Sequence, residues 1–246
     1  MDLKRRFPAL ALGGTVLATA MLAGAGGVAA QEGASYRVWV FNLASGQPLT
    51  PPVVVLHNDK TSIVEPGQPA SAELQQLAEN GNNEPLVEAL NADKNVFGVA
   101  TGAAPILSGG APGAAEFPSY AVIDVDSSGK ADRISVASML ICSNDGFSKL
   151  SAKKLPKKVG QQVVYVTDAY DAGTEINTEV LADMVPPCQG LVGVSSDAEG
   201  TGETDPSLAE NGVVTPHPGI AGAADLDPEI HAVASAPAVI IVQRTA

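Results

Sequence analysis

The sequence predicts an all-β protein, an antiparallel β-sandwich with two short helices and long acidic loops. Segments rich in β-branched and aromatic residues dominate the chain, and Gly, Pro, Asn and Asp residues separate them. Only two stretches have helical periodicity, and both are short. About 216 residues follow an N-terminal export signal, which is enough for one sandwich with a sizeable core.

Six segments have the length and composition of strands. They are 36–43 (YRVWVFNL), 53–57 (VVVLH), 120–125, 133–141, 162–170 and 237–243 (PAVIIVQ). The last of them is apolar enough for a buried strand, and a terminal strand of this kind usually pairs with an early one. We therefore expect the last strand to pair with an early strand and so hold the two ends of the domain together.

Two short helices are predicted after the second of these strands. Ser71 is placed to cap a helix N-terminus, and Asn80-Gly81 is typical of the end of that helix. A second helix is predicted over 82–90, where Pro85 falls in the first turn. We expect both helices to pack over the sandwich.

The N-terminal segment 1–30 has the features of a secretory signal peptide. Basic residues at 4–6 precede an apolar run at 9–28, and small residues then offer a cleavage site. The apolar run is also long enough for a retained membrane anchor, although its Gly content and the small residues at its end favour cleavage of the segment. We predict a secreted protein, extracellular or in the periplasm or cell envelope, whose domain 31–246 does not insert into a membrane.

The charge balance is strongly acidic. The chain has 14 basic and 27 acidic residues, and without 1–30 it has 11 and 26, a net charge of −15. Such a surface repels phosphate backbones, and no basic patch is evident in the sequence, so nucleic acid is not an expected partner. The stretch 193–235 is rich in Gly, Pro, Asp and Glu, which predicts long, partly mobile acidic loops.

The two cysteines, Cys142 and Cys188, predict one disulfide in an exported chain. A bridge across 46 residues contributes ~3–4 kcal/mol to stability in the chain-entropy model. Two buried free thiols are the alternative.

Acidic residues beside glycines follow two of the predicted strands. Asp171 and Glu175 flank Gly173, which can fold the chain back, and Asp145 precedes Gly146 in SNDGF. If these strands end at one edge of the sandwich, their carboxylates repel one another unless a cation lies between them. Calcium fits, because it takes six to eight oxygen ligands in irregular geometry. A solvated loop is the alternative for each pattern alone.

A rival cation loop lies at 124–132 (DVDSSGKAD), whose acids match positions 1, 3 and 9 of an EF-hand loop. Position 12 is Ser135 where a Glu is needed, and strands flank the loop where an EF-hand has helices. We interpret it as a hairpin turn on Ser128-Gly129.

Catalytic patterns are absent from the sequence. The three histidines, His57, His217 and His231, are accompanied by no GxSxG, HExxH or paired CxxC motif. We expect these histidines in loops or on strand surfaces and expect no enzymatic activity.

Several segments resemble the spondin N-terminal domain family, in the form found in secreted bacterial proteins. They are YRVWVFNLASGQPLTPPVV, EPGQPASAELQQLAENGNNEPL, ISVASMLICSNDGFSKL, AYDAGTEINTE and PAVIIVQR. SNDGF and DAGTE are the specific pair. The resemblance implies a sandwich similar to the calcium- and lipid-binding sandwich of synaptotagmin-type domains. It also implies calcium ligands at Asp145, Asp171 and Glu175, where Glu175 stands for a usual Asp.

The resemblance implies an adhesion or interaction module at the cell surface or in an extracellular matrix. Its partner is expected to be an extracellular or cell-envelope protein or glycan. Two alternatives stay open at this point. The carboxylates could hold the ion of a metal-dependent hydrolase, or the protein could be a purely structural envelope component.

Overall fold

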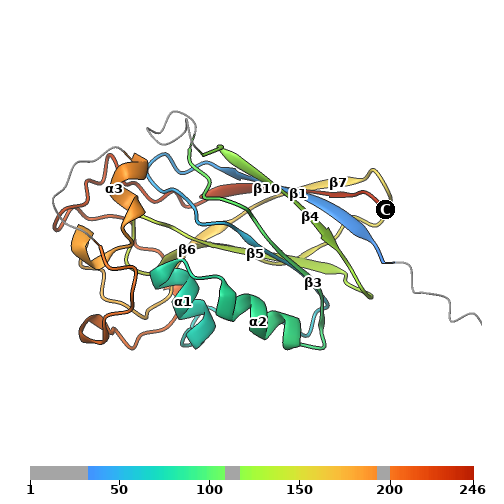
Figure 1. Ribbon diagram of the computed structural model, residues 1–246, viewed down its shortest axis with the longest axis horizontal. Helices are drawn as coiled ribbons and strands as arrows, with labels where there is room; N and C mark the ends of the chain where they lie inside the picture. The colour runs from blue at the N-terminus through green and yellow to red at the C-terminus, as the bar shows by residue number, and fades with distance from the viewer. Residues whose placement is uncertain (1–32, 109–116, 193–199) are drawn as a thin grey trace, which may run out of the picture. The chain divides into compact units, whose positions relative to one another are not determined.

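Strands dominate the part of the chain that the computed structural model describes, residues 33–108, 117–192 and 200–246 (Figure 1). The strands are β1 (Ser35–Asn42), β2 (Val53–His57), β3 (Val96–Thr101), β4 (Tyr120–Asp126), β5 (Arg133–Met139), β6 (Gly146–Lys154), β7 (Gln162–Val166), β8 (Asp168–Asp171), β9 (Thr215–Pro216) and β10 (Ala238–Arg244). The helices are α1 (Ala72–Asn80), α2 (Glu84–Ala92) and α3 (Pro187–Val192), with 3-10 turns η2 (Leu181–Asp183) and η3 (Pro206–Leu208). The predicted signal peptide 1–30 and residues 193–199 of the predicted acidic loop region lie outside the described residues.

The strands form two antiparallel sheets, which confirms the predicted all-β sandwich. One sheet has the order β4-β1-β10-β7 and the other the order β3-β2-β5-β6-β8-β9. In the first sheet Trp39 lies opposite Val122 on β4 and opposite Ile241 on β10. The closing strand therefore pairs with the first strand, as the sequence predicts.

Two apolar cores lie on opposite faces of the six-stranded sheet. The core between the sheets includes Val38, Val54 and Ile240, and the core under α1 and α2 includes Val53 and Leu77. Every residue of β2 is consequently buried, which is why its first four residues are all apolar where a half-exposed strand would alternate.

Both predicted helices form where the sequence places them. The Ser71 hydroxyl accepts a hydrogen bond from the N–H of Leu74 at 3.2 Å, and Gly81 ends α1 in the left-handed conformation with φ 65°. Pro85 lies in the first turn of α2. Figure 1 shows both helices on one side of the six-stranded sheet.

Two predictions about strand connections are wrong. The predicted strand 162–170 is two strands, because the chain leaves the four-stranded sheet at Thr167, whose hydroxyl accepts a bond from Ala238 N at 2.9 Å. The loop around Ser128-Gly129 is not a hairpin turn, since β4 and β5 belong to different sheets. Its Ser128 N–H instead donates to Phe97 O at 2.7 Å.

Part of the outer face of the four-stranded sheet is apolar. Two cross-strand rows run over β4, β1, β10 and β7: Tyr120, Phe41, Val239 and Val166 in one, and Val122, Trp39, Ile241 and Val164 in the other. The outermost members are 44–62% exposed. No other layer of the described structure covers this face in the way that α1 and α2 cover the opposite sheet.

Candidate metal centre

The turn between β5 and β6 holds Asp145 rigidly. Ser143 Oγ donates to Leu140 O at 2.7 Å and accepts from Gly146 N at 3.0 Å. The predicted disulfide between Cys142 and Cys188 is confirmed and ties the same turn to α3, with a Cα–Cα distance of 5.1 Å. The bridge indicates an oxidising compartment.

The DAGTE loop wraps around the Asp145 carboxylate. It begins where Asp171 ends β8, directly opposite Gly146 on β6. The N–H groups of Thr174 and Glu175 donate to Asp145 Oδ2 at 2.7 and 3.1 Å, and the Thr174 hydroxyl approaches the same oxygen at 3.2 Å. The two loops that the sequence singled out are therefore neighbours.

Gly173 makes this wrapping possible. Its φ is 67°, in the left-handed region that favours glycine. A Cβ atom there would also lie 2.6 Å from the backbone N and O of Val213. The segment that contains Val213 packs on the loop, and the N–H of Gly212 donates to Gly173 O at 2.7 Å.

Three carboxylates converge at this place: one oxygen of each of Asp145, Asp171 and Glu210 lies within 4.8 Å of the others. Asp145 is 0% exposed and Asp171 is 4% exposed, while Glu210 is exposed. Within the described residues, this group has the composition and spacing of a site that could hold a metal ion.

Glu210 was missed in the sequence because nothing local marks it. It reaches the group through a long-range contact, in which its N–H donates to Thr174 O at 3.1 Å. The neighbouring Ala209 forms an isolated antiparallel bridge with Glu175. This part of the predicted acidic loop region thus lies directly on the DAGTE loop.

The cluster is electrostatically unfavourable without a cation. Burial, and next the nearby Asp171 carboxylate, raise the pKa of Asp145 from 3.8 to about 7. Asp145 Oδ1 is buried and has no hydrogen-bond partner among the described residues. Asp171 is better satisfied, because Gly173 N and Asn177 Nδ2 donate to its two oxygens at 2.8 and 2.6 Å. The unpartnered oxygen is the one that an ion would take.

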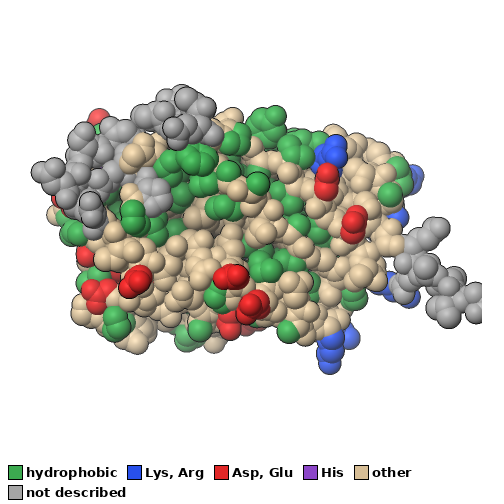
Figure 2. All heavy atoms as spheres, viewed as in Figure 1, with side chains coloured by type: hydrophobic (Ala, Val, Ile, Leu, Met, Phe, Trp, Pro, Cys, Tyr) green, Lys and Arg blue, Asp and Glu red, His purple; other side chains and the backbone are tan. Residues whose placement is uncertain are grey.

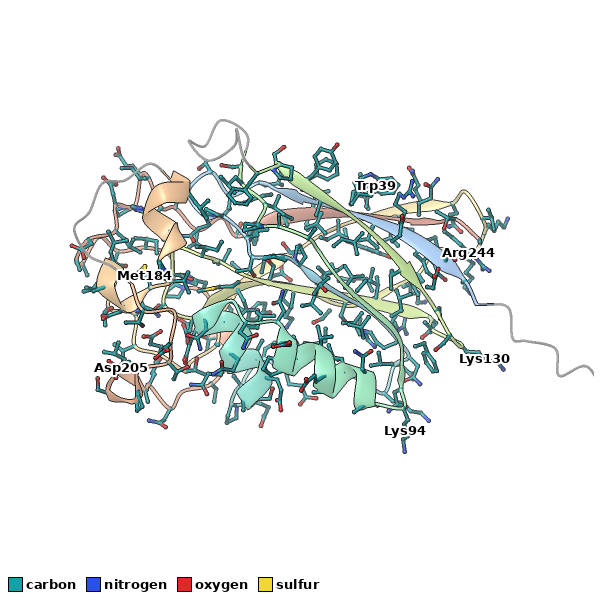
Figure 3. All side chains as sticks on the ribbon, in the orientation of Figure 1. Trp39, Lys94, Lys130, Met184, Asp205 and Arg244 are labelled. Atoms are coloured by element: carbon teal, nitrogen blue, oxygen red, sulfur yellow. A yellow bond between two sulfur atoms is a disulfide. The ribbon has the colours of Figure 1, made fainter. Side chains whose placement is uncertain are left out.

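Glu175, the third predicted ligand, contributes its backbone N–H to Asp145 and is not a member of the group within 4.8 Å. Its carboxylate lines a pocket of about 280 Å³ together with Asp183 and Asp205. Burial first, and then the nearby Glu79 and other carboxylates, raise the pKa of Glu175 to about 8. Figure 3 labels Asp205 at this end of the sandwich.

Other acidic and amide side chains near the site hold loops together. Asn144 donates to Thr178 Oγ1 at 3.2 Å and accepts from Glu179 N at 3.3 Å. Both carboxylate oxygens of Glu179 accept backbone N–H bonds, from Ala221 at 2.5 Å and Ala223 at 2.6 Å. Glu179 thereby fastens part of the predicted acidic loop region.

The rival loop at 124–132 forms no metal cluster among the described residues. Asp124 pairs with Arg37 at 2.7 Å, and Asp126 accepts from the Ser35 hydroxyl at 2.6 Å. Both acids already have partners on β1, which leaves them unsuited to share an ion.

His217 and His231 lie in loops, as the sequence predicts, although His231 is 0% exposed. The expectation of a loop or strand surface is wrong for His57, which lies on β2 and is also 0% exposed. His57 contacts Asn58 O at 2.6 Å and Ser135 Oγ at 2.8 Å. His217 is near the metal cluster, where burial lowers its pKa while the Asp171 charge opposes that shift. Its Nδ1 accepts from Gly219 N at 2.9 Å.

No protein-family model matches the chain, and no curated protein is significantly similar to it. Fold and site together define an all-β sandwich with one disulfide and a buried carboxylate cluster that could hold a metal ion. Among the described residues, no helix has both the length and the apolar character needed to cross a bilayer.

Proposed function

We propose that the protein is a secreted, non-enzymatic interaction module whose two strand-end loops are fixed by calcium. The observation that carries the metal part is Asp145, a completely buried carboxylate with one oxygen that has no hydrogen-bond partner among the described residues. Asp171 and Glu210 supply two further oxygens within 4.8 Å. A buried, unpaired carboxylate of this kind is costly unless a cation or a proton neutralises it.

Calcium is favoured by the chemistry of the donors. The three side chains of the group offer only carboxylate oxygens, the hard ligands that calcium prefers over nitrogen or sulfur. The ligands come from three separate chain segments, and calcium tolerates such irregular geometry better than magnesium does. By analogy with other extracellular modules, we expect a dissociation constant of ~10⁻⁴–10⁻³ M.

The secreted location is supported by the disulfide and by the signal-like composition of 1–30. We also propose membership of the spondin N-terminal family, supported by the adjacency of the SNDGF and DAGTE loops. The non-enzymatic part of the proposal is supported by the sequence, in which the histidines are accompanied by no GxSxG, HExxH or paired CxxC motif.

A calcium titration followed by thermal unfolding tests the metal proposal. In roughly 10 mM calcium, the affinity above implies a rise in Tm of about 3–10 °C, which EDTA should reverse. Asp171→Asn should abolish the rise, whereas Asp168→Asn, the same change on the exposed side of β8, should retain it. An Asp171→Asn protein that responds like wild type would refute the site. Metal-dependent hydrolysis that is lost in Asp145→Asn would favour the hydrolase alternative instead.

The interaction role is supported by the apolar part of the outer face of the four-stranded sheet, where Val122 is 48% and Val164 is 62% exposed. Large exposed apolar patches commonly mark interaction sites. Binding of labelled protein to cell surfaces and to extracellular matrix, in calcium and in EDTA, tests this role. A Val122→Asp, Val164→Asp variant should bind more weakly, and Ile230→Asp, at a 44% exposed loop position between β9 and β10, is the control. A folded protein that binds neither surface would favour the purely structural alternative.

A further inference from the structure

The basic residues of this acidic protein gather at one end of the sandwich. Residues 31–246 contain 11 Lys and Arg residues, and six of them lie at the start of β5, the end of β6, the loop after β6 and the end of β10: Arg133, Lys153, Lys154, Lys157, Lys158 and Arg244. On the face that Figure 2 shows, the Lys and Arg side chains lie in the right-hand half, where Figure 3 labels Arg244 and Lys130. The sequence did not reveal this patch, because three separate chain segments build it.

Four of these residues line a pocket of about 470 Å³, which we call the basic pocket: Arg133, Lys154, Lys157 and Arg244. Tyr36, Leu155 and Pro156 add apolar surface, and Asp132 is its one acidic lining residue. The pocket is large enough for one or two sugar units of a ligand. It combines apolar walls with a small number of charged groups, as binding sites for polar ligands commonly do.

Within the basic pocket, Arg244 is held in position, and Lys154 and Lys157 have no acidic partner among the described residues. Arg244 Nη1 donates to Lys157 O at 2.7 Å and its Nε to Ala246 O at 2.8 Å, so the guanidinium is held in place. Arg133 is 3.9 Å from Asp132, a weak contact. Among the described residues, no acidic side chain forms a salt bridge with Lys154, Lys157 or Arg244.

We propose that the basic pocket binds the sulfate or carboxylate groups of an acidic polysaccharide. Guanidinium and ammonium groups recognise such oxyanions through charge-assisted hydrogen bonds. Lys153 and Lys158 adjoin the pocket in the chain and are exposed, so they extend the positive surface for a ligand that carries repeated charges. A flat anionic membrane fits less well, because the rest of the domain carries excess negative charge and would be repelled.

The basic pocket is separate from the metal centre. Both belong to the β5–β6 pair, but Arg133 pairs with Lys154 at one end, while Met139 pairs with Phe147 beside the turn that holds Asp145. Arg133 and Met139 are six positions apart along β5, which corresponds to ~20 Å. The polysaccharide proposal does not depend on calcium, and the two proposals can fail independently.

Binding of the purified protein to heparin and to polygalacturonate tests the proposal, with neutral dextran as the control ligand. We expect binding to at least one acidic polysaccharide, weakening steeply with salt, and no binding to dextran. Lys154→Gln, Lys157→Gln should weaken it roughly tenfold. Lys60→Gln, Lys94→Gln removes the same charge from exposed positions outside the basic pocket and should leave affinity within twofold. Binding should persist in EDTA and in Asp171→Asn.

Four results would overturn the proposal. They are equal losses in the two double variants, equal affinity for duplex DNA, binding only to vesicles of anionic lipid, and a thermal shift with inorganic sulfate but no polysaccharide binding. Circular dichroism of the double variants shows whether they fold. If Lys154→Gln, Lys157→Gln does not fold, salt-dependent competition between heparin and dextran on wild type, with the single Lys157→Gln, decides the question.

Discussion

The backbone N–H of Thr174 donates to Oδ2 of Asp145 at 2.7 Å. Glu175 N donates to the same oxygen at 3.1 Å, while Oδ1 has no partner among the described residues. The carboxylate thus has two different roles. One oxygen holds the DAGTE loop against the β5–β6 turn, and the other is available to an ion.

The identity of the third acidic ligand is the first testable point. Glu210→Gln should weaken calcium binding about tenfold, because Glu210 is the acid that shares the group within 4.8 Å with Asp145 and Asp171. Glu175→Gln should change the affinity by less than about threefold, since Glu175 contributes its backbone N–H. Isothermal titration calorimetry distinguishes the two. The reverse order would restore Glu175 as the ligand.

Stability of the metal-free protein should fall as pH rises. The pKa of Asp145 is about 7 in the folded state against 3.8 ordinarily, so between these values the folded state binds more protons than the unfolded state. The linkage sign then makes stability highest at low pH, with a loss of up to ~4 kcal/mol by neutral pH. Calcium replaces the proton and should reduce this loss.

Urea unfolding in EDTA and in calcium, across pH 4.5 to pH 7.5, measures this effect. Asp145→Asn carries no charge to bury, so in EDTA it should be more stable than wild type at pH 7.5. Its stability should also depend less on pH. If wild type and variant share one pH profile in EDTA, the buried charge is not the source of the instability.

Most of the fold could be predicted from the sequence. Strands that are buried on both faces and helices with capping residues have recognisable local sequence patterns. Val53–Leu56 is continuously apolar, and Ser71 with Gly81 delimits α1. Connections were harder to predict. Nothing in the run through Thr167 shows that the chain changes sheets there, since that change depends on a long-range bond with Ala238.

The candidate metal centre could be predicted only in part, because some of its residues are brought together by long-range contacts. Asp145 and Asp171 follow strands and stand beside glycines, so the sequence marks them locally. Glu210 is one of many acids in a loop-like stretch, and only the bond from its N–H to Thr174 O brings it to the cluster. Arg244 and Lys157 likewise meet through tertiary pairing across 87 positions, which no local pattern displays.

Removal of the disulfide should loosen the metal centre as well as the fold. The double variant Cys142→Ser, Cys188→Ser should lose ~3–4 kcal/mol of stability, from a closed loop of 46 residues. Because Cys142 is three residues from Asp145, calcium affinity should fall too. Chemical unfolding and calorimetry measure the two effects. Unchanged calcium affinity in the folded variant would show that the β5–β6 turn is rigid without the bridge.

Substitution of two glycines with positive φ distinguishes the stability cost of backbone strain from the cost of a steric clash. Gly160 has φ 82° and open space around a Cβ position, whereas at Gly173, with φ 67°, the Cβ would lie 2.6 Å from the Val213 backbone. Gly160→Ala should cost about 1–2 kcal/mol, the penalty for an L-residue in the left-handed region. Gly173→Ala should cost at least about twice as much, because the backbone of Val213 must also move.

The same comparison reports on the metal centre. A shift of the chain at Gly173 moves the N–H groups of Thr174 and Glu175 away from Asp145 Oδ2, and it displaces the segment that carries Glu210. Gly173→Ala should therefore weaken calcium binding, and Gly160→Ala should not. Urea unfolding in EDTA gives the stability cost, and calcium titration gives the affinity. Equal costs with unchanged affinity would mean that the segment around Val213 yields freely, and it would then be too loosely held to bring Glu210 to a metal ion.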